Sequence, residues 1–318
     1  MSNKTLRERI GAELGIQKAA LNRLIARSPY TYKTYVIPKK SGGRRVIAQP
    51  ARETKYIQNW LICNVLDALP LHKSATAYAK GSSIKKNAKE HRSSSYIVKL
   101  DFKDFFTSIK GDHIKSHLMR HLGGALTEQD IDDIIRICCI RHKNGSPLCL
   151  SIGAPSSPLI SNSIMYEFDT LVSQWCLEGK INYTRYADDL TFSTSEDGIS
   201  SLIEKEVRDT ARKLEYPAIR FNTKKTTHLS KRHQRRITGI VINNEGRLSL
   251  GRDRKRMISS LVHKYKIGIL TGDQIFQLQG LLGFAKDVEP LFLARLRGKY
   301  GAETISTILR IRKIKEQT

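Results

Sequence analysis

The sequence predicts an α+β fold in which an antiparallel sheet is backed by helices and flanked by helical subdomains. The spacing of hydrophobic residues changes along the chain: some segments have the 3.6-residue period of helices, and others have the alternation of strands. The predicted segments run helix, hairpin, helix, strand, helices, hairpin, helix, strands, helices, which is not the regular alternation of a doubly wound sheet. A chain of 318 residues is also long enough for two or three packed units.

The first half of the chain is predicted mainly from apolar spacing and from turn residues. A helix is interrupted near Gly15, and a Lys-Ser-Gly-Gly turn joins the arms of a hairpin. Pro70 ends the next helix. In chain order we expect a helix over 5–27, the hairpin over 32–50, a helix over 51–69, a strand over 94–106, and helices over 112–122 and 127–141.

The second half is predicted in the same way. Its hairpin turns at Ala187-Asp188, and its C-terminal helices are interrupted at Gly268, Gly272 and Pro290. In chain order we expect a long helix over 158–178, the hairpin over 181–194, a helix over 198–215, short strands over 218–230 and 235–243, and helices from 252 to the end.

The charge of the chain indicates an anionic partner. Lys and Arg number 55 against 30 Asp and Glu, which gives a net charge of +25. Basic residues concentrate in 31–60, 231–260 and 291–318, whereas acidic residues stand in the central runs KLDFKDFF and YADDLTF. No apolar stretch approaches the roughly 20 residues of a membrane-spanning helix, and the N-terminus has no apolar signal-peptide core. This pattern favours a nucleic-acid groove with a metal site in its floor over a membrane surface.

The cysteines and histidines predict no zinc site. Five cysteines lack Cys-x-x-Cys spacing, which is typical of a reduced, cytoplasmic protein. We expect Cys138 and Cys139 to be buried. His113, His117 and His121 share one helix face, but no cysteine stands nearby to complete a site.

Three carboxylates are the candidate catalytic groups. Asp101 follows an apolar strand, and Asp188-Asp189 stands at a tight turn between two strands. If the fold brings them together, they can hold two magnesium ions for phosphoryl transfer. Taken alone, Asp-Asp at a hairpin tip is ordinary turn chemistry.

Six motifs follow one another along the chain: TYVIPKKSGGRRVIAQP, LDFKDFF, GAPSSPLISNSI, YTRYADDLTFS, RFNTKKT and RRITGIVI. In this order they resemble successive blocks of reverse transcriptases, and the first resembles the fingers block of that family. The resemblance runs from about residue 30 to about 250 and implies a right-hand polymerase. It implies an N-terminal extension (1–29), fingers (30–95 and 112–157), a palm (96–111 and 158–245) and a thumb (246–318).

Two further elements resemble those of bacterial retron reverse transcriptases, within the group II intron-like superfamily. Asn87-Ala88-x-x-His91 precedes the first carboxylate motif, and Thr238-Gly239 comes after the motif RFNTKKT, within RRITGIVI. The resemblance implies RNA contacts here and along a basic helix, although His91 is at least as well explained by a loop or core contact. The implied RNA-binding residues are Asn87, His91, Thr238, Gly239, Arg252, Arg254, Lys255 and Arg256.

By the same resemblance, Asp101, Asp188 and Asp189 would bind two Mg²⁺, with the backbone carbonyl of Phe102 as a further ligand. Lys225 would donate a proton to the leaving pyrophosphate.

The resemblance also implies a deoxynucleotide site. Arg45 would meet the triphosphate, and Lys103 and Asp104 fall where the backbone approaches it. Phe106 would block a ribose 2′-hydroxyl, while its neighbour Phe105 is expected in the core.

The resemblance implies a retron enzyme that copies part of a cognate non-coding RNA into single-stranded DNA. Synthesis would start from a guanosine 2′-hydroxyl, leave a branched RNA–DNA product, and serve anti-phage defence with a separate effector protein. Two alternatives stay open: another bacterial reverse transcriptase without 2′-priming, either group II intron-like or diversity-generating, or a basic RNA-binding scaffold with weak catalysis. Ile152 keeps the second open, because it replaces the glutamine common before Gly153.

Overall fold

The computed structural model describes residues 4–38, 42–142 and 145–311. Some of the basic residues counted above lie outside these ranges, as does part of the predicted Lys-Ser-Gly-Gly turn: Lys39, Lys40, Ser41, Arg312, Lys313 and Lys315. The chain divides into two compact units. The first is Met1–Lys80, Val98–Thr191 and Gly198–Thr227, and the second is Gly81–Ile97, Phe192–Asp197 and His228–Thr318.

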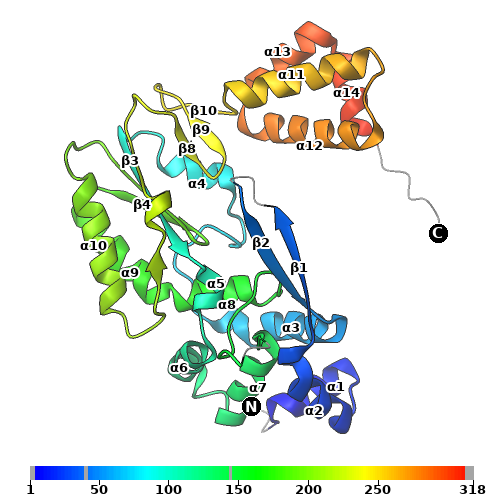
Figure 1. Ribbon diagram of the computed structural model, residues 1–318, viewed down its shortest axis with the longest axis vertical. Coiled ribbons are helices and arrows are strands. Elements are labelled where there is room, and N and C mark those ends of the chain that lie inside the picture. The colour runs from blue at the N-terminus through cyan, green and yellow to red at the C-terminus, as the bar shows by residue number, and fades with distance from the viewer. Residues whose placement is uncertain (1–3, 39–41, 143–144, 312–318) are drawn as a thin grey trace. The chain divides into compact units, whose positions relative to one another are not determined.

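The N-terminal part of the first unit follows the predicted order. Gly15 ends the first helix at φ 66°, a left-handed conformation that glycine adopts at little cost, so the predicted interruption is confirmed. The first two strands pair antiparallel and form a two-stranded ribbon (Figure 1). The elements are α1 (Leu6–Leu14), α2 (Lys18–Arg27), β1 (Tyr32–Pro38), β2 (Arg44–Pro50) and α3 (Arg52–Asn64).

The central sheet has the strand order β4-β5-β3-β6, and β7 also pairs with β3. Apolar side chains of β3 such as Val98 and Leu100 are buried, so this strand is fixed in the core. The α+β class is confirmed. The strands are β3 (Tyr96–Lys103), β4 (Asn182–Tyr186), β5 (Asp189–Thr194), β6 (Arg220–Phe221) and β7 (Thr227–Leu229).

Several helices are shorter than the apolar pattern predicts. The expected helix over 158–178 is two helices, α8 (Ser157–Ile164) and α9 (Tyr166–Glu178), because Met165 leaves helical geometry with ψ 4°. The helix expected over 127–141 ends at Cys138, because Ile140 pairs instead with Cys149.

Other elements of this unit also end early. The strand expected over 94–106 ends at Lys103, since left-handed Asp104 starts a short helix. The remaining helices are α5 (Phe105–Ser108), α6 (Gly111–Leu122), α7 (Glu128–Cys138) and α10 (Ser200–Lys213).

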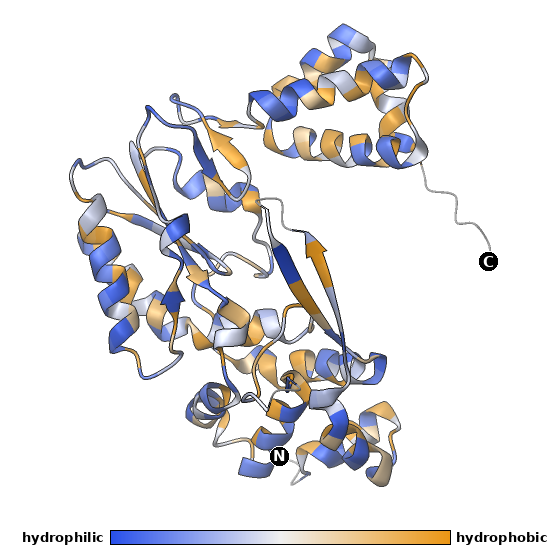
Figure 2. Ribbon diagram, viewed as in Figure 1, coloured by the Kyte–Doolittle hydropathy of each residue, from blue (hydrophilic) through white to orange (hydrophobic). Residues whose placement is uncertain are grey.

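The second unit is a helical group with a small sheet of order β10-β9-β8. Its helices carry both hydrophobic and hydrophilic residues (Figure 2), and residues such as Ile237, Ile258 and Leu282 form one buried core. The sequence did not predict α4 or the break at Gly301. The elements are α4 (Ile84–Glu90), β8 (Arg235–Ile237), β9 (Ile240–Ile242), β10 (Leu248–Ser249), α11 (Arg252–Lys266), α12 (Gly272–Val288), α13 (Pro290–Tyr300) and α14 (Ala302–Arg310).

No helix in the described ranges combines the length and the apolar character needed to cross a membrane.

Candidate active site

The β4–β5 turn brings the predicted carboxylates together. Ala187, in the left-handed region at φ 57°, reverses the chain directly before Asp188 and Asp189. The backbone N–H of Phe102 donates to the Asp188 carbonyl at 3.0 Å. Asp101 precedes Phe102 on β3, so its carboxylate lies beside the turn although it is remote in sequence.

A fully buried arginine, Arg185, fixes the position of this turn. The Arg185 guanidinium donates to both oxygens of buried Asp169, with a shortest distance of 2.6 Å. It also donates to the Asn162 side-chain oxygen and to the Ala187 carbonyl, both at 3.1 Å. The Tyr183 hydroxyl donates to the same Asp169 carboxylate at 2.7 Å. Hydrogen bonds through Arg185 therefore connect the backbone of Ala187 to α8 and α9.

The three carboxylates repel one another electrostatically. Burial, and then the neighbouring Asp101 carboxylate, raise the pKa of Asp188. Burial, and then Asp188, raise the pKa of Asp189 to about 6. Each raised pKa means that nearby positive charge does not fully compensate the negative charge of the carboxylate. A bound cation would supply the missing positive charge.

Both polar residues of the Asn-x-x-Lys motif bind Asp101. Lys225 Nζ lies 2.7 Å from Asp101 Oδ2, and the Asn222 amide donates to Oδ1 at 3.3 Å. A short 3-10 turn over Thr223–Lys225 gives the two side chains this spacing. Burial opposes the charge of Lys225, but the bond to Asp101 and the carboxylates of the turn outweigh it and raise the pKa of Lys225.

The three aspartates fit hard divalent cations, which prefer carboxylate oxygens. Within the described ranges, no three or more His, Cys, Asp or Glu side chains are grouped so that they alone could hold a metal ion. Asp101, Asp188 and Asp189 would therefore need further oxygen ligands, for which the Phe102 carbonyl, phosphate and water are suitable.

The predicted triphosphate contact, Arg45, projects from the exposed part of β2. Its positive charge reaches Asp188, whose pKa it lowers in part. Strand β2 is fixed by two bonds, from the Ala48 N–H to the Ile152 carbonyl at 2.8 Å and from Ser151 Oγ to the Ala48 carbonyl at 3.1 Å. Ile152 thus contributes a main-chain contact in this loop.

Gly153 allows the same close approach. A Cβ atom at this residue would lie 3.0 Å from the Ala48 carbonyl, and φ is 120°. The motif therefore needs glycine here for packing.

The residues after Asp101 separate into exposed and packed positions. Lys103 and Asp104 are exposed, and Asp104 is left-handed at φ 52°. Phe105 is buried and stacks on Phe102 with ring centroids 5.6 Å apart, so its expected core position is confirmed. Phe106 is half-buried and meets Phe105 edge-on at 5.4 Å.

The retron-type elements make interior contacts in the second unit. Asn87 and His91 are fully buried, and His91 Nδ1 lies 2.8 Å from Ser193 Oγ. Burial lowers the pKa of His91 to about 3, so the ring is neutral at pH 7. Their side chains are not on the surface, and the core contact weighed for His91 describes its surroundings better than direct RNA contact.

Thr238 and Gly239 form the two-residue loop between β8 and β9. Both have positive φ, 45° and 87°, as a type I′ hairpin turn requires. Thr238 Oγ1 donates to the Ile84 carbonyl at 3.2 Å, and Arg254 donates to the Gly239 carbonyl at 2.9 Å. This turn is therefore packed between α4 and α11.

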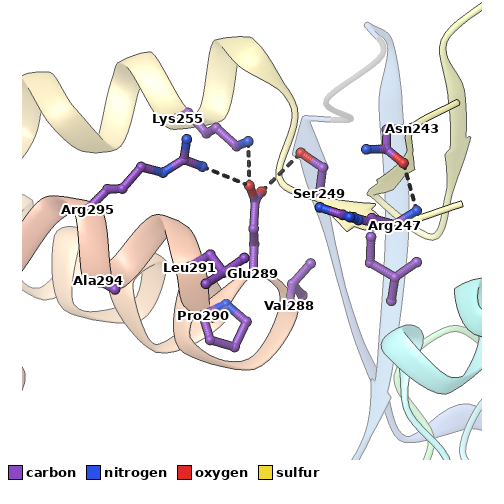
Figure 3. Close-up of a pocket in the computed structure, with 11 residues that line it drawn as sticks. Asn243, Arg247, Ser249, Lys255, Val288, Glu289, Pro290, Leu291, Ala294 and Arg295 are labelled. Atoms are coloured by element: carbon purple, nitrogen blue, oxygen red, sulfur yellow. Dashed lines mark hydrogen bonds and ion pairs between the residues drawn. The ribbon is translucent and has the colours of Figure 1, made fainter. Parts of the chain in front are cut away.

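The four basic residues predicted on α11 divide into two pairs. Arg254 binds Gly239 and lies over the Phe284 ring at 4.9 Å, and Lys255 lies 2.6 Å from a Glu289 carboxylate oxygen (Figure 3). Arg252 and Arg256 are exposed. Of the four side chains, those of Arg252 and Arg256 are the more exposed to solvent.

Glu289 organises a cavity of about 780 Å³ in this unit (Figure 3). Its carboxylate accepts from Ser249 Oγ at 3.0 Å and lies 3.5 Å from Arg295. Burial alone would raise the pKa of Glu289, but its bonds to Lys255, the Leu250 N–H and Ser249 lower it. Lys255 therefore belongs to a partly buried ion pair.

The histidine face and the cysteines play no visible part in this site. His117 is buried with Nε2 2.7 Å from Ser163 Oγ, and its ring lies 4.5 Å from His121, while His113 caps α6 through the Lys110 N–H. Cys138 and Cys139 are buried free thiols, as predicted.

Sequence reasoning missed the buried network and one exposed aromatic residue. Arg185 could have been recognised from the sequence, because an arginine in an apolar strand next to an acidic turn needs a buried partner. Asp169 and Asn162 could not be recognised, since both stand in an ordinary helical pattern. Tyr78, which lies in the electrostatic range of Asp188, could not be recognised either.

The chain is similar in sequence to known proteins, and solved structures also resemble it. Residues 37–242 match the model of the family described as reverse transcriptase (RNA-dependent DNA polymerase). The chain is 43% identical over 310 residues to the retron Ec83 reverse transcriptase of Escherichia coli, covering 94% of this chain and 97% of that protein. It is 36% identical to the retron Ec73 reverse transcriptase of Escherichia coli, over 88% and 90% of the two chains. A foamy viral protease-reverse transcriptase structure is 16% identical, covers 88% and 44%, and has a TM-score of 0.47.

The chain therefore belongs to the reverse transcriptase family and, within it, to the bacterial retron reverse transcriptases. It is an RNA-directed DNA polymerase, and RNA templates are its partners. The family uses divalent metal ions. This membership supports the retron interpretation over the alternatives of another bacterial reverse transcriptase and of a scaffold.

Replacing Arg185 by Met should lower the free energy of unfolding by about 3–5 kcal/mol, because Asp169 would be left as an unpaired buried charge. Replacing Arg212 by Met is the matched control, since its pair with Asp209 is largely exposed and worth roughly 0–1 kcal/mol. Chemical denaturation measures both. Equal small losses would contradict the role given to the buried pair.

The Asp189→Asn variant should stabilise the metal-free protein in chelator at pH 7.5 by about 1–3 kcal/mol. The folded-state pKa of about 6 lies above the unfolded value, so the wild-type penalty is absent below about pH 4, builds between about pH 4 and 6, and is fully present above that range. The stabilisation should disappear near pH 4 in thermal unfolding. Asp67→Asn, at an exposed position, should change little, and a pH-independent effect of Asp189→Asn would be the contrary result.

Proposed function

We propose that this enzyme copies part of a cognate structured RNA into single-stranded DNA, starting from a guanosine 2′-hydroxyl of that RNA and leaving a branched RNA–DNA product. The observation that carries the proposal is its 43% identity to a retron reverse transcriptase over nearly the full length of both chains. The proximity of Asp101, Asp188 and Asp189 supports active chemistry. We further propose a cytoplasmic role in anti-phage defence with a separate effector protein.

Asp101, Asp188 and Asp189 would hold two magnesium ions, completed by the Phe102 carbonyl. When bound there, the ions would lower the pKa of the attacking hydroxyl and stabilise the negative charge of the leaving pyrophosphate. Lys225 remains protonated at neutral pH because its pKa is raised, so it can donate a proton to the pyrophosphate. This transfer requires its ammonium group to leave Asp101, and half of its side chain is exposed, which permits that movement.

The nucleotide would lie between these carboxylates and Arg45. The Arg45 guanidinium would pair with the triphosphate, with Lys103 and Asp104 alongside. Phe106 would exclude the ribose 2′-hydroxyl by its ring, so deoxynucleotides are the substrates. In this assignment residues 30–95 and 112–157 are the fingers, 96–111 and 158–245 the palm, and 246–318 the thumb, preceded by an extension over 1–29.

Recognition of the cognate RNA would use the C-terminal region. Arg252 and Arg256 stand one helical turn apart on α11 and are exposed, so both can meet phosphates of one RNA strand. Arg254 and Lys255 would act indirectly, by holding the β8–β9 turn and Glu289. Asn87 and His91 would shape the same unit from its interior.

The priming proposal is tested on the nucleic acid that copurifies with the protein expressed beside its native flanking DNA. We expect RNA joined to DNA by a 2′,5′ bond, which debranching enzyme releases as free single-stranded DNA. The Asp188→Asn/Asp189→Asn variant should retain the RNA within a few-fold but carry no DNA. DNA with an ordinary 3′,5′ junction would refute 2′-priming, whereas DNA in the double variant would refute the catalytic assignment.

The Arg252→Gln/Arg256→Gln variant should bind RNA more weakly and with a flatter salt dependence, because two phosphate contacts are lost. The negative slope of the logarithm of the binding constant against the logarithm of the salt concentration should become less negative by about 1.4–1.8. Lys205→Gln/Lys213→Gln on α10 removes the same charge from exposed positions outside the C-terminal region and should leave the slope unchanged. Equal slopes for both variants would contradict an RNA surface on α11.

A further inference from the structure

Tyr78 combines an exposed ring with an unusual backbone. Its side chain is 58% exposed, and its φ of 62° lies in the left-handed region that bulky residues rarely adopt. Such a conformation persists only where the surroundings fix it, and it is concentrated at functional sites.

The surroundings that fix Tyr78 are those that hold the catalytic turn. The segment before it forms a parallel bridge between Ala75 and Arg185. The Thr76 N–H donates to the Arg185 carbonyl at 2.8 Å, and the Asn162 amide donates to the buried Ala77 carbonyl at 2.8 Å. Asn162 also accepts from the Arg185 guanidinium, so one network positions both Tyr78 and the turn.

The Tyr78 phenol lies in the field of the proposed nucleotide site. Partial desolvation of the phenol, followed by the Asp188 carboxylate and Tyr186, raises the pKa of Tyr78, and Arg45 acts in the opposite direction. The phenol is therefore neutral at physiological pH, and the bridge from Ala75 to Arg185 places the segment before Tyr78 beside β4, the strand that leads into Asp188 and Asp189.

We propose that Tyr78 is a substrate-contacting residue whose ring stacks on the base of the incoming deoxynucleotide. An exposed aromatic ring that the core does not need is a sequence-tolerant platform for any base. The left-handed backbone directs this ring from the end of an anchored segment, so little ordering is required on binding. The inference rests on the proposed nucleotide site between Asp188 and Arg45.

Single-nucleotide incorporation on an RNA template with an ordinary DNA primer tests the proposal and does not depend on 2′-priming. Tyr78→Ala should raise the KM for deoxynucleotide at least fivefold, while the Kd for primer–template stays within twofold. Tyr78→Phe should remain within twofold of wild type, because the ring is retained. Both substitutions keep an L side chain at the same φ, so backbone strain is matched.

Tyr56→Ala is the control, since that ring on α3 is 59% exposed. If Tyr78→Ala behaves like Tyr56→Ala, the contact does not exist, and if Tyr78→Phe is as impaired as Tyr78→Ala, stacking is wrong. The Arg45→Gln variant distinguishes a failure of the proposed nucleotide site from a failure of the Tyr78 assignment alone. An unchanged KM in that variant would overturn the nucleotide site itself, whereas a raised KM there with a normal Tyr78→Ala would overturn only the assignment of Tyr78.

Discussion

The buried ion pair between Arg185 and Asp169 is the interaction on which the active site depends. Transfer of both charges from water is costly and is offset only when their hydrogen bonds are satisfied. Here Asp169 accepts from both Arg185 and Tyr183, and Arg185 donates further to Asn162 and to the Ala187 carbonyl. These bonds join α8, α9 and β4 to the left-handed residue of the turn.

Such rigid support is needed because the turn assembles groups that repel one another. Burial and mutual repulsion raise the pKa of both Asp188 and Asp189, so the site would relax if its backbone were free. Lys225 supplies positive charge at Asp101, and Arg45 supplies it at longer range. The scaffold thus maintains an excess of negative charge, which favours divalent cations and the phosphates they carry.

The sequence was sufficient for features set by local chemistry. Alternation, turn residues and motif order predicted the β1–β2 ribbon, the β4–β5 turn and the convergence of Asp101 with Asp188. It was insufficient where tertiary contacts decide. Met165 divides a continuous helical pattern, and the partners of Arg254 and Lys255 are remote residues that make two of four apparent surface charges structural. His91 likewise appears polar in sequence but is enclosed by the fold.

We expect the turn held by Arg185 to present Asp101, Asp188 and Asp189 as one metal-binding catalytic centre. Anomalous X-ray scattering from crystals of the protein with Mn²⁺, primer–template and a non-hydrolysable deoxynucleotide measures this directly. We predict anomalous peaks within coordination distance of carboxylate oxygens of all three aspartates, with Lys225 displaced from Asp101. Peaks elsewhere, with Lys225 still bonded to Asp101, would show that the three aspartates do not form one metal centre.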